Sequence, residues 1–448
     1  MDFIKLARNY KDEMISELIT LMEIQSTLDE KTSSKDAPFG KSISEAMKFM
    51  LQKGQQNGFA IKDIDGYAAR ISLGHQESSV SLLGHLDVVP GHAEQFKPFI
   101  KDGFLVGRGA LDDKGPTMAA FYAMKILKDL NVKFKHRIDL IVGGDEETHM
   151  RCMAYYKENE DLPLMGYVPD AEFPGVFAEK GILNFDIVLE NKTVIKNMNA
   201  GTRPNIVIEK AQAQLKHGIQ NDSFEFYLRS NNLEGTFEET KLEMIGKAYH
   251  ASIPYKGNNA GVHLINYIAA ETNDDFLLKL AEALRNPFGL GLGVDYESAQ
   301  MEQLTMNVGI ISIDENEIRI TLDIRYPNEL TAQDIIEKIE SKLNSKLQNI
   351  SDSEPHYIDP ASSLVTTALA AYQKVTNDFD SKVTLMGGGT YARTLPNHIA
   401  FGADFPRRYK PDWVGGPHEK NEAVEIESLV LATAIYAEAL VSIAELEE

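Results

Sequence analysis

The segment SVSLLGHLD, residues 79–87, ends an apolar run with a histidine and an aspartate. Similar apolar runs recur at residues 138–142 and 167–168, and a helical pattern spans residues 117–130 between the first two runs. Alternation of short apolar strands with helices is typical of a sheet covered by helices. The sequence therefore predicts an α/β fold around this segment.

The predicted pattern of secondary structure changes after residue 180. Longer, half-alternating strands are predicted at residues 182–189, 224–228 and 317–324, together with a helix at residues 332–343. The alternation of helices with short apolar strands resumes near the C-terminal end, with an apolar helical segment at residues 362–375, a strand at 382–386 and a helix from about 424 to 446. We therefore predict one discontinuous domain, residues 1–178 and 359–448, interrupted by an α+β insertion at residues 179–358.

Composition narrows the class of protein. The chain has 448 residues, of which 43% are hydrophobic and 25% charged, as expected of a globular protein. Its formal net charge of -22 repels nucleic acid and anionic membrane surfaces, so neither is an expected partner. The charged residues within positions 1–23 are incompatible with a signal peptide and predict an amphipathic helix, and the apolar stretch 429–437 is too short to span a bilayer.

A single cysteine, Cys152, excludes an intrachain disulfide and a cysteine-based zinc site. A reducing, cytoplasmic location fits this count. A nucleophilic role for Cys152 is possible in principle, but a lone thiol is more often a packed residue.

Acidic and imidazole side chains recur at the predicted strand ends. They are His85 with Asp87, Asp112 with Asp113, the acids at 145–147, Asp170, and His418. A lone histidine is usually structural, and an isolated acidic turn is usually solvated. Because ligands collect at strand ends in open α/β sheets, their shared position predicts one site instead.

The residue types at these positions favour a metal site. Three consecutive acids at the end of an apolar strand repel one another unless a cation neutralises them. Imidazole and carboxylate ligands suit Zn²⁺ or Mn²⁺, and the acids outnumber the ligands of one tetrahedral zinc ion. We therefore predict two divalent metal ions per chain, Zn or Mn, that share a carboxylate, with a further carboxylate to take a proton from water.

The motifs resemble those of the metallopeptidase superfamily of glutamate carboxypeptidases, aminoacylases and carnosinases, and most closely the PepV-type dipeptidases. The matching segments are GHLD (84–87), GRG to DDKG (107–115), DEE (145–147), PDAEFP (169–174), YHASIP (249–254), GNNA (257–260), GGGTYAR (387–393) and GGPHE (415–419). The resemblance implies a catalytic domain with a mixed sheet flanked by helices, of the phosphorylase/hydrolase-like, zinc-peptidase type, and an inserted α+β lid. It extends from residue 84 to residue 418.

The resemblance also implies roles for individual residues. The first metal ion takes His85 and Asp170, the second takes Glu147 and His418, and Asp112 bridges both. Glu146 acts as the general base and Asp87 as the orienting acid. The peptide between Asp112 and Asp113 is expected to be cis.

On the inserted lid, the resemblance implies that His250 donates to the developing oxyanion and that Arg325 binds the substrate carboxylate. Asn205, Gly388 and Thr390 resemble further substrate contacts, although Asn205 is followed by the apolar residues IVI (206–208) where relatives often have a proline. The substrate amine is read by Asp113 or Glu172 in this interpretation, with no basis for choosing between them.

The predicted activity is hydrolysis of unblocked dipeptides by a monomer whose partner is a small peptide substrate. The resemblance implies that a lid of this length supplies within one chain what other relatives supply by dimerisation, and hence a monomer. An alternative within the same superfamily is a deacylase or desuccinylase of N-acyl amino acids, because these enzymes share the metal ligands. A non-catalytic binding protein is a third hypothesis, which the complete set of ligands and the base does not favour.

Overall fold

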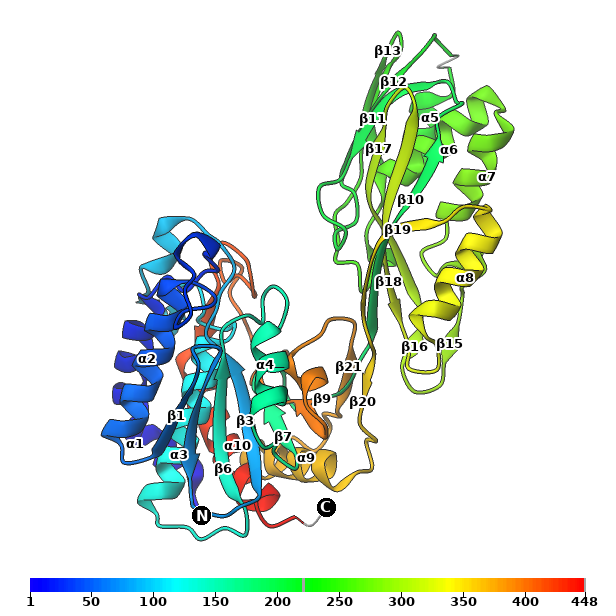
Figure 1. Ribbon diagram of the computed structural model, residues 1–448. Helices are drawn as coiled ribbons and strands as arrows, with labels where there is room; N and C mark the ends of the chain where they lie inside the picture. Colours follow the sequence, from blue (N-terminus) through cyan, green and yellow to red (C-terminus); the bar gives the residue numbers. More distant parts are fainter. Residues whose placement is uncertain (220–221, 447–448) are drawn as a thin grey trace. The chain divides into compact units, whose positions relative to one another are not determined.

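The computed structural model describes residues 1–219 and 222–446 (Figure 1). The chain divides into two compact units. Unit 1 contains residues Met1–Ala178, Ile358–Thr384 and Gly389–Glu448, and unit 2 contains Glu179–Tyr357 and Leu385–Gly388. Unit 1 is thus assembled from both ends of the chain, and unit 2 from its middle.

The main sheet of unit 1 brings together strands from both ends of the chain. In the order β1-β2-β6-β3-β7-β22-β9, they are Ala60–Ile64, Ala68–Leu73, Arg137–Gly143, Ser79–His85, Gly166–Val168, His398–Ala400 and Val176–Glu179. Strand β3 is parallel to β6 and β7, and β22 is parallel to β7, whereas β1, β2 and β9 pair antiparallel. The sheet is mixed, as predicted.

The three parallel strands β3, β6 and β7 explain where the site forms. Every residue of β3 is buried, as is almost all of β6, because helices cover the sheet. The carboxyl ends of parallel strands meet at one edge, where ligands bind in open α/β sheets. The residues that directly follow these strands therefore lie close together.

Helices cover both faces of this sheet (Figure 1). Helix α3 (Lys114–Asp129) packs beside α10 (Ile426–Ile443), which also contacts α1 (Phe3–Met22) and α9 (Ser363–Thr376). Helix α2 (Lys41–Gln56) contacts β1 and β2, and α4 (Arg151–Asn159) lies on the face opposite α3. Among the described residues, α10 alone is long and apolar enough to cross a membrane, but 72% of it is buried within the protein, as in a core helix.

A small second sheet in unit 1 contributes directly to the site. It has the order β24-β5-β4, with β24 at Ala423–Glu425, β5 at Phe104–Val106 and β4 at Phe99–Lys101. Ala423 pairs with Val106, so segments more than 300 residues apart run side by side. This pairing places the loop after β5 next to the loop before β24.

Unit 2 is an antiparallel sheet with helices packed against it. In the order β13-β14-β12-β11-β17-β18-β10-β19, its strands are Glu234–Glu238, Lys241–Ile245, Lys210–Leu215, Ile195–Ala200, Thr305–Ile313, Glu317–Tyr326, Gly181–Glu190 and Leu347–Ser353. Its helices are α5 (Phe224–Ser230), α6 (Ala260–Thr272), α7 (Asp275–Leu284) and α8 (Ala332–Leu343). Their apolar faces form one continuous core with the sheet.

The remaining elements are short. Strands β8 (Ala171–Glu172) and β23 (Ala403–Asp404) pair in unit 1, and β15 (Glu297–Ser298) and β16 (Glu302–Gln303) pair in unit 2. Strands β20 (His356–Tyr357) and β21 (Thr384–Met386) lie on the segments that link the units. Single 3₁₀ turns occur at Glu30–Thr32, Ala93–Phe96, Pro254–Lys256, Leu290–Leu292 and Tyr391–Thr394.

Most predicted elements are present, with one wrong assignment. The helix predicted at residues 332–343 is α8, and the strand predicted at 182–189 lies within β10. Residues 224–228, predicted as a strand, instead begin the helix α5. Phe224 and Leu228 are four residues apart and both buried, a spacing that a helix places on one side. The terminal helix begins at Ile426, because Ala423–Glu425 belong to β24.

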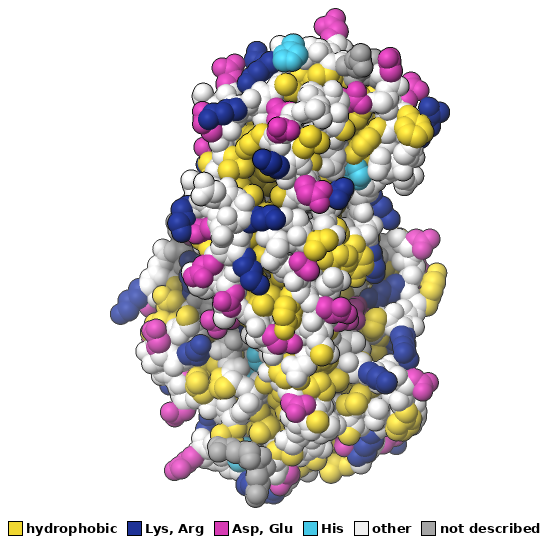
Figure 2. Space-filling view, turned by 90° about the vertical axis from the view of Figure 1, so that its right-hand side faces the viewer, with side chains coloured by type: hydrophobic (Ala, Val, Ile, Leu, Met, Phe, Trp, Pro, Cys, Tyr) yellow, Lys and Arg dark blue, Asp and Glu magenta, His cyan; other side chains and the backbone are white. Residues whose placement is uncertain are grey.

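Charged side chains of both signs are mixed on the face of the molecule drawn in Figure 2. Lysine and arginine side chains alternate there with acidic and apolar ones. Exposed ion pairs on the surface of the protein include Lys97 with Glu94 and Arg285 with Glu282. Exposed pairs of this kind contribute little to stability, so the charge pattern mainly keeps the surface solvated.

Candidate metal centre

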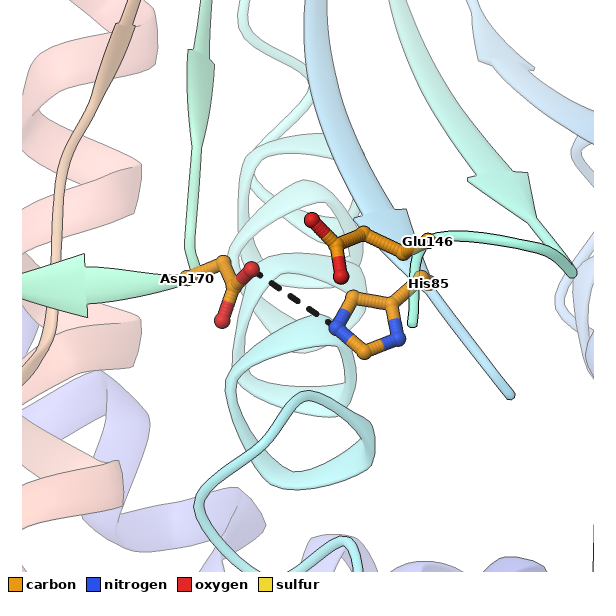
Figure 3. Close-up of side chains that lie close together, drawn as sticks. All are labelled: His85, Glu146 and Asp170. Atoms are coloured by element: carbon orange, nitrogen blue, oxygen red, sulfur yellow. Dashed lines mark ion pairs between the residues drawn. The ribbon is translucent and has the colours of Figure 1, made fainter. Parts of the chain in front are cut away.

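One group of potential ligands lies at the carboxyl ends of the parallel strands (Figure 3). His85 is the last residue of β3, Glu146 lies just beyond β6, and Asp170 lies just beyond β7. One ligand atom from each lies within 4.8 Å of the others. The Nε2 atom of His85 is 3.6 Å from Oδ2 of Asp170.

A second group consists of Asp112, Glu147 and His418, which also meet within 4.8 Å. The Nε2 atom of His418 is 3.0 Å from Oε2 of Glu147. Asp112 and His418 do not follow strands of the main sheet, which corrects the expectation that all these residues lie at strand ends. Asp112 precedes α3, and His418 lies in the loop before β24, so the small sheet brings these two segments together.

Asp112 lies between the two groups. Its Oδ1 atom is 3.1 Å from Nε2 of His85, and its Oδ2 atom is 2.9 Å from Nε2 of His418. One carboxylate thus presents an oxygen to a histidine of each group. This is the geometry required of a carboxylate that bridges two cations.

The surroundings of the Nε2 atom of His85 favour a bound proton or a bound cation. Its imidazole is buried, and its Nδ1 atom lies 2.9 Å from the carbonyl oxygen of Asp87, to which it can only donate. In the neutral ring, Nε2 then carries a lone pair that faces the carboxylates of Asp112 and Asp170. Burial lowers the pKa of His85, but hydrogen bonds from the protonated ring to Asp112, Asp170 and Asp87 outweigh it and raise the pKa well above its ordinary value. A cation held there would relieve the repulsion between this lone pair and the carboxylates.

The closeness of several carboxylates helps to raise the pKa values of three residues in the two ligand groups. Burial and the charge of Asp112 raise the pKa of Asp170 to about 7. Burial, together with the charges of Asp170, Glu147 and Asp112, raises the pKa of Glu146 well above its ordinary value, although His85 opposes this. Hydrogen bonds to Asp112 and Glu147 raise the pKa of His418 to about 10. The residues therefore require bound protons or bound cations to neutralise them.

Asp87 is buried behind the first group. Its Oδ2 atom accepts a hydrogen bond of 3.0 Å from the backbone N–H of Glu147, so it holds the segment that carries both glutamates. The Oδ1 atom of Asp87 is 3.5 Å from Nδ1 of His85, whereas the backbone carbonyl oxygen of Asp87 is only 2.9 Å from the same atom. Asp87 thus orients the imidazole mainly through its backbone, and the loop after β6 through its side chain.

Asp113 cannot read the substrate amine, which removes one of the two predicted candidates. It is fully buried and accepts hydrogen bonds from the backbone N–H of His85, at 3.1 Å, and from Oγ1 of Thr117, at 2.9 Å. The neighbouring Gly84 is required because a Cβ atom there would lie 2.0 Å from Oγ1 of Thr117. Asp113 therefore fixes β3 to α3, and its peptide bond with Asp112 is cis, as expected.

The first of the three consecutive acids has a structural role. Asp145 is paired with Arg151, whose Nε atom lies 2.7 Å from its Oδ2 atom, and it also accepts from the hydroxyl of Thr148. Only Glu146 and Glu147 of the three face the ligand groups. The expectation that all three acids need a metal cation is therefore wrong for Asp145, which an arginine neutralises.

Cys152 is a packed residue. Its thiol is buried and lies 2.8 Å from the hydroxyl of Tyr391. Burial raises the pKa of the thiol to about 12. Tyr391 in turn packs edge to face against the ring of His85, with centroids 6.1 Å apart. The cysteine thus supports the wall of the site and is not a nucleophile.

Four of the predicted substrate contacts gather within unit 2. The segments of Asn205 and His250 pair through a bridge between Ile206 and His250 and a bond of 3.0 Å from Ala251 N–H to the carbonyl oxygen of Asn205. Both side chains are exposed, and Nδ1 of His250 lies 2.8 Å from Oγ of Ser252.

Arg325 is buried, and Asp323 already binds it. Its Nε and Nη2 atoms donate to Asp323 at 2.6 and 2.8 Å, and Nη1 donates to the carbonyl oxygen of Gly387, next to Gly388, at 2.6 Å. A substrate carboxylate would have to share this guanidinium with Asp323. Thr390 belongs to unit 1, where its side chain caps the 3₁₀ turn at Tyr391–Thr394.

Two buried residues beside the second group were not predicted to belong to the site. Arg108 and Glu422 form an ion pair of 2.5 Å, with 3% and 1% of each residue exposed. Arg108 stands between two glycines in the segment 107–109, but Glu422 has no local sequence signal. Their pairing depends on the small sheet, which sequence patterns did not predict.

Comparisons with known proteins agree with this architecture. A model of the peptidase family M20/M25/M40 matches residues 81–442. A protein of Staphylococcus epidermidis named "Putative dipeptidase" is 35% identical, covering 96% of this chain and 97% of its own. "Putative dipeptidase YtjP" of Bacillus subtilis is also 35% identical, with 97% and 98% covered. The solved structure of the dipeptidase Dug1p from Saccharomyces cerevisiae, 16% identical, shares the fold with a TM-score of 0.60 over 100% of this chain and 99% of that one.

Proposed function

The chain belongs to peptidase family M20/M25/M40 and is a metallopeptidase, and we propose that it hydrolyses the amide bond of unblocked dipeptides with two divalent metal ions, Zn or Mn. The single observation that carries this proposal is Asp112, whose two oxygens face histidines of two separate ligand groups. The names of relatives that match almost the whole chain support the choice of dipeptides.

The ligands divide between two ions in this proposal. His85 and Asp170 would hold the first, Glu147 and His418 would hold the second, and Asp112 would serve both. Bound ions would polarise the scissile carbonyl and lower the pKa of the attacking water. Histidine and carboxylate ligands suit Zn²⁺ and Mn²⁺ alike, so the donor set does not choose between these metals.

Glu146 supplies the proton transfers. It lies within 4.8 Å of the ligand atoms of His85 and Asp170, so geometry alone allows it to be a ligand or a base. We assign it as the base because Asp112 can complete both groups without it. Glu146 then accepts the proton of the attacking water and delivers it to the departing amine nitrogen. Its partly buried position beside His85 and Asp170 limits the access of bulk water that would compete for that proton.

Substrate binding is assigned to residues of unit 2. His250 donates to the carbonyl oxygen as negative charge develops there, and Arg325 binds the terminal carboxylate. Their grouping with Asn205 and the Gly387–Gly388 segment supports this assignment. Thr390 of unit 1 is a further proposed contact, and the exposed Glu172 is the remaining candidate for the amine. We also propose that the enzyme acts as a cytoplasmic monomer.

A panel of substrates tests the proposal. The full-length protein, loaded with Mn²⁺ or Zn²⁺, is assayed against unblocked dipeptides, the same dipeptides with an acetylated amine, and N-acetyl and N-succinyl amino acids. We expect hydrolysis of the unblocked dipeptides and little of the others. Turnover of only the acyl compounds would instead establish a deacylase or desuccinylase.

A further inference from the structure

The two ligands Asp112 and His418 belong to loops that no strand of the main sheet fixes. Asp112 follows the hairpin of β4 and β5, and His418 precedes β24. The small sheet aligns the two loops, and the backbone N–H of Gly107 donates to the carbonyl oxygen of Glu422 at 2.9 Å. The position of these ligands therefore depends on what connects the loops beyond this sheet.

Glu422 holds the loop that carries Asp112. Its Oε1 atom accepts hydrogen bonds from the backbone N–H groups of Leu111, at 3.1 Å, and Asp112, at 3.2 Å. Its Oε2 atom accepts from Nη1 of Arg108 at 2.5 Å. A single buried carboxylate thus fixes the backbone of the bridging ligand and the arginine beside it.

Arg108 extends the connection to the other ligand. Its Nη2 atom donates to the backbone carbonyl oxygen of His418 at 3.1 Å. His418 has a left-handed backbone, with φ of 65°, which is uncommon for a residue with a side chain and needs support from its surroundings. The hydrogen bond from Arg108 supplies such support, because it holds the backbone carbonyl group of His418 itself.

A buried ion pair is by itself weak evidence for a stabilising role. This pair differs because Nη2 of Arg108 and Oε1 of Glu422 bond to the backbones of two ligands of one group. We propose that Arg108 and Glu422 are positioning residues that fix the separation of Asp112 and His418 and thereby set the metal affinity of the group Asp112, Glu147 and His418. This inference rests on the two-ion site of the proposed function.

The inference predicts a selective effect. The group formed by His85, Glu146 and Asp170 is held by β3, β6 and β7, whereas within the described part of the chain the hydrogen bonds of the two side chains of the pair, apart from the one that joins them, go to Leu111, Asp112 and His418. Loss of the pair should therefore weaken the site of Glu147 and His418 more than the site of His85 and Asp170, because the latter depends on the pair only through Asp112. Residues that orient metal ligands typically change affinity by about 10-fold to 100-fold when replaced.

The experiment compares matched variants of the full-length protein. Glu422→Gln keeps the shape of the side chain but turns an amide toward Arg108, and Arg108→Lys keeps the charge but cannot reach both Glu422 and the His418 carbonyl. The control is Asp139→Asn, which removes a buried carboxylate of β6 that accepts from Arg137 at 2.9 Å and from Ser72 at 2.6 Å. Thermal unfolding confirms that each variant is folded.

Metal-stripped proteins are titrated with Mn²⁺ and with Zn²⁺ by calorimetry. The wild type and the control should show two binding events per chain. Either variant of the pair should weaken one event by about 10-fold to 100-fold and the other, which shares only Asp112, by clearly less, and excess Mn²⁺ should restore most of its hydrolysis rate. His418→Ala identifies the affected event, because it removes a ligand of the same group.

Two unchanged binding events in folded Glu422→Gln and Arg108→Lys would overturn the inference and leave the proposed function standing. Equal weakening of the two binding events in a variant of the pair would also overturn the inference. So would weakening of both events in the control Asp139→Asn, because loss of any buried carboxylate would then lower metal affinity through overall stability alone. Fewer than two events in the wild type would contradict the two-ion site itself, and the inference would fall with it.

Discussion

Replacing Glu146 with glutamine separates its two possible roles. Glutamine preserves the volume of the side chain and removes its negative charge and its ability to take a proton. As a base, Glu146 is needed for hydrolysis but not for holding metal. As a ligand, which its 4.8 Å proximity to His85 and Asp170 permits, it would be needed for both.

The expected loss of hydrolysis rate follows from the role of Glu146 as a general base. A positioned general base contributes about 10²-fold to 10⁴-fold in rate, which corresponds to about 3 to 5 kcal/mol in activation free energy. Folding should not suffer, because the charges of Asp170, Glu147 and Asp112 already disfavour an ionised Glu146. Glutamine removes this repulsion, so the melting temperature of the metal-free protein should stay equal or rise.

The assay measures kcat on an unblocked dipeptide beside metal content by mass spectrometry. Glu147→Gln serves as the matched control, because the neighbouring glutamate faces His418 at 3.0 Å and is assigned as a ligand. Glu146→Gln should lose activity at unchanged metal content, whereas Glu147→Gln should lose metal. Loss of one ion per chain in Glu146→Gln would refute its assignment as the base.

Three further predictions follow from the structure. Chelation with EDTA should abolish hydrolysis, and Mn²⁺ or Zn²⁺ should restore it, whereas full activity in metal-free protein would contradict a metallopeptidase mechanism. The thiol of Cys152, which is buried and has a pKa raised to about 12, should react with thiol reagents at pH 8 only after unfolding; rapid labelling of the native protein would show that it is accessible. Leu440→Ala, which removes a fully buried side chain from α10, should destabilise unit 1 by about 2 to 5 kcal/mol and lower its melting temperature, and an unchanged melting temperature would count against a core position.

Much of the fold could be predicted because its signals are local. The apolar runs that became β3 and β6 are followed directly by His85 and Glu146, and parallel pairing then brings both residues to one edge. The wrong strand at residues 224–228 shows the limit of such signals. A short apolar run has the same composition in a strand and in a helix, and only packing against the core of unit 2 decides between them.

The less predictable parts of the site depend on distant contacts. Asp145, Glu146 and Glu147 are indistinguishable by composition, and only the position of Arg151 shows that Asp145 is neutralised away from the ligand groups. The pairing of Arg108 with Glu422 joins residues more than 300 positions apart through a three-stranded sheet. No periodicity or spacing in one sequence carries that information.

Activity measured against metal equivalents tests the central proposal most directly. Metal-stripped protein receives increasing amounts of Mn²⁺ per chain, and hydrolysis of one unblocked dipeptide is recorded at each step. If two ions share Asp112 and act together, the rate should rise mainly with the second equivalent and then level off. A rate that is complete at one equivalent, or that does not depend on the metal, would contradict the two-ion mechanism.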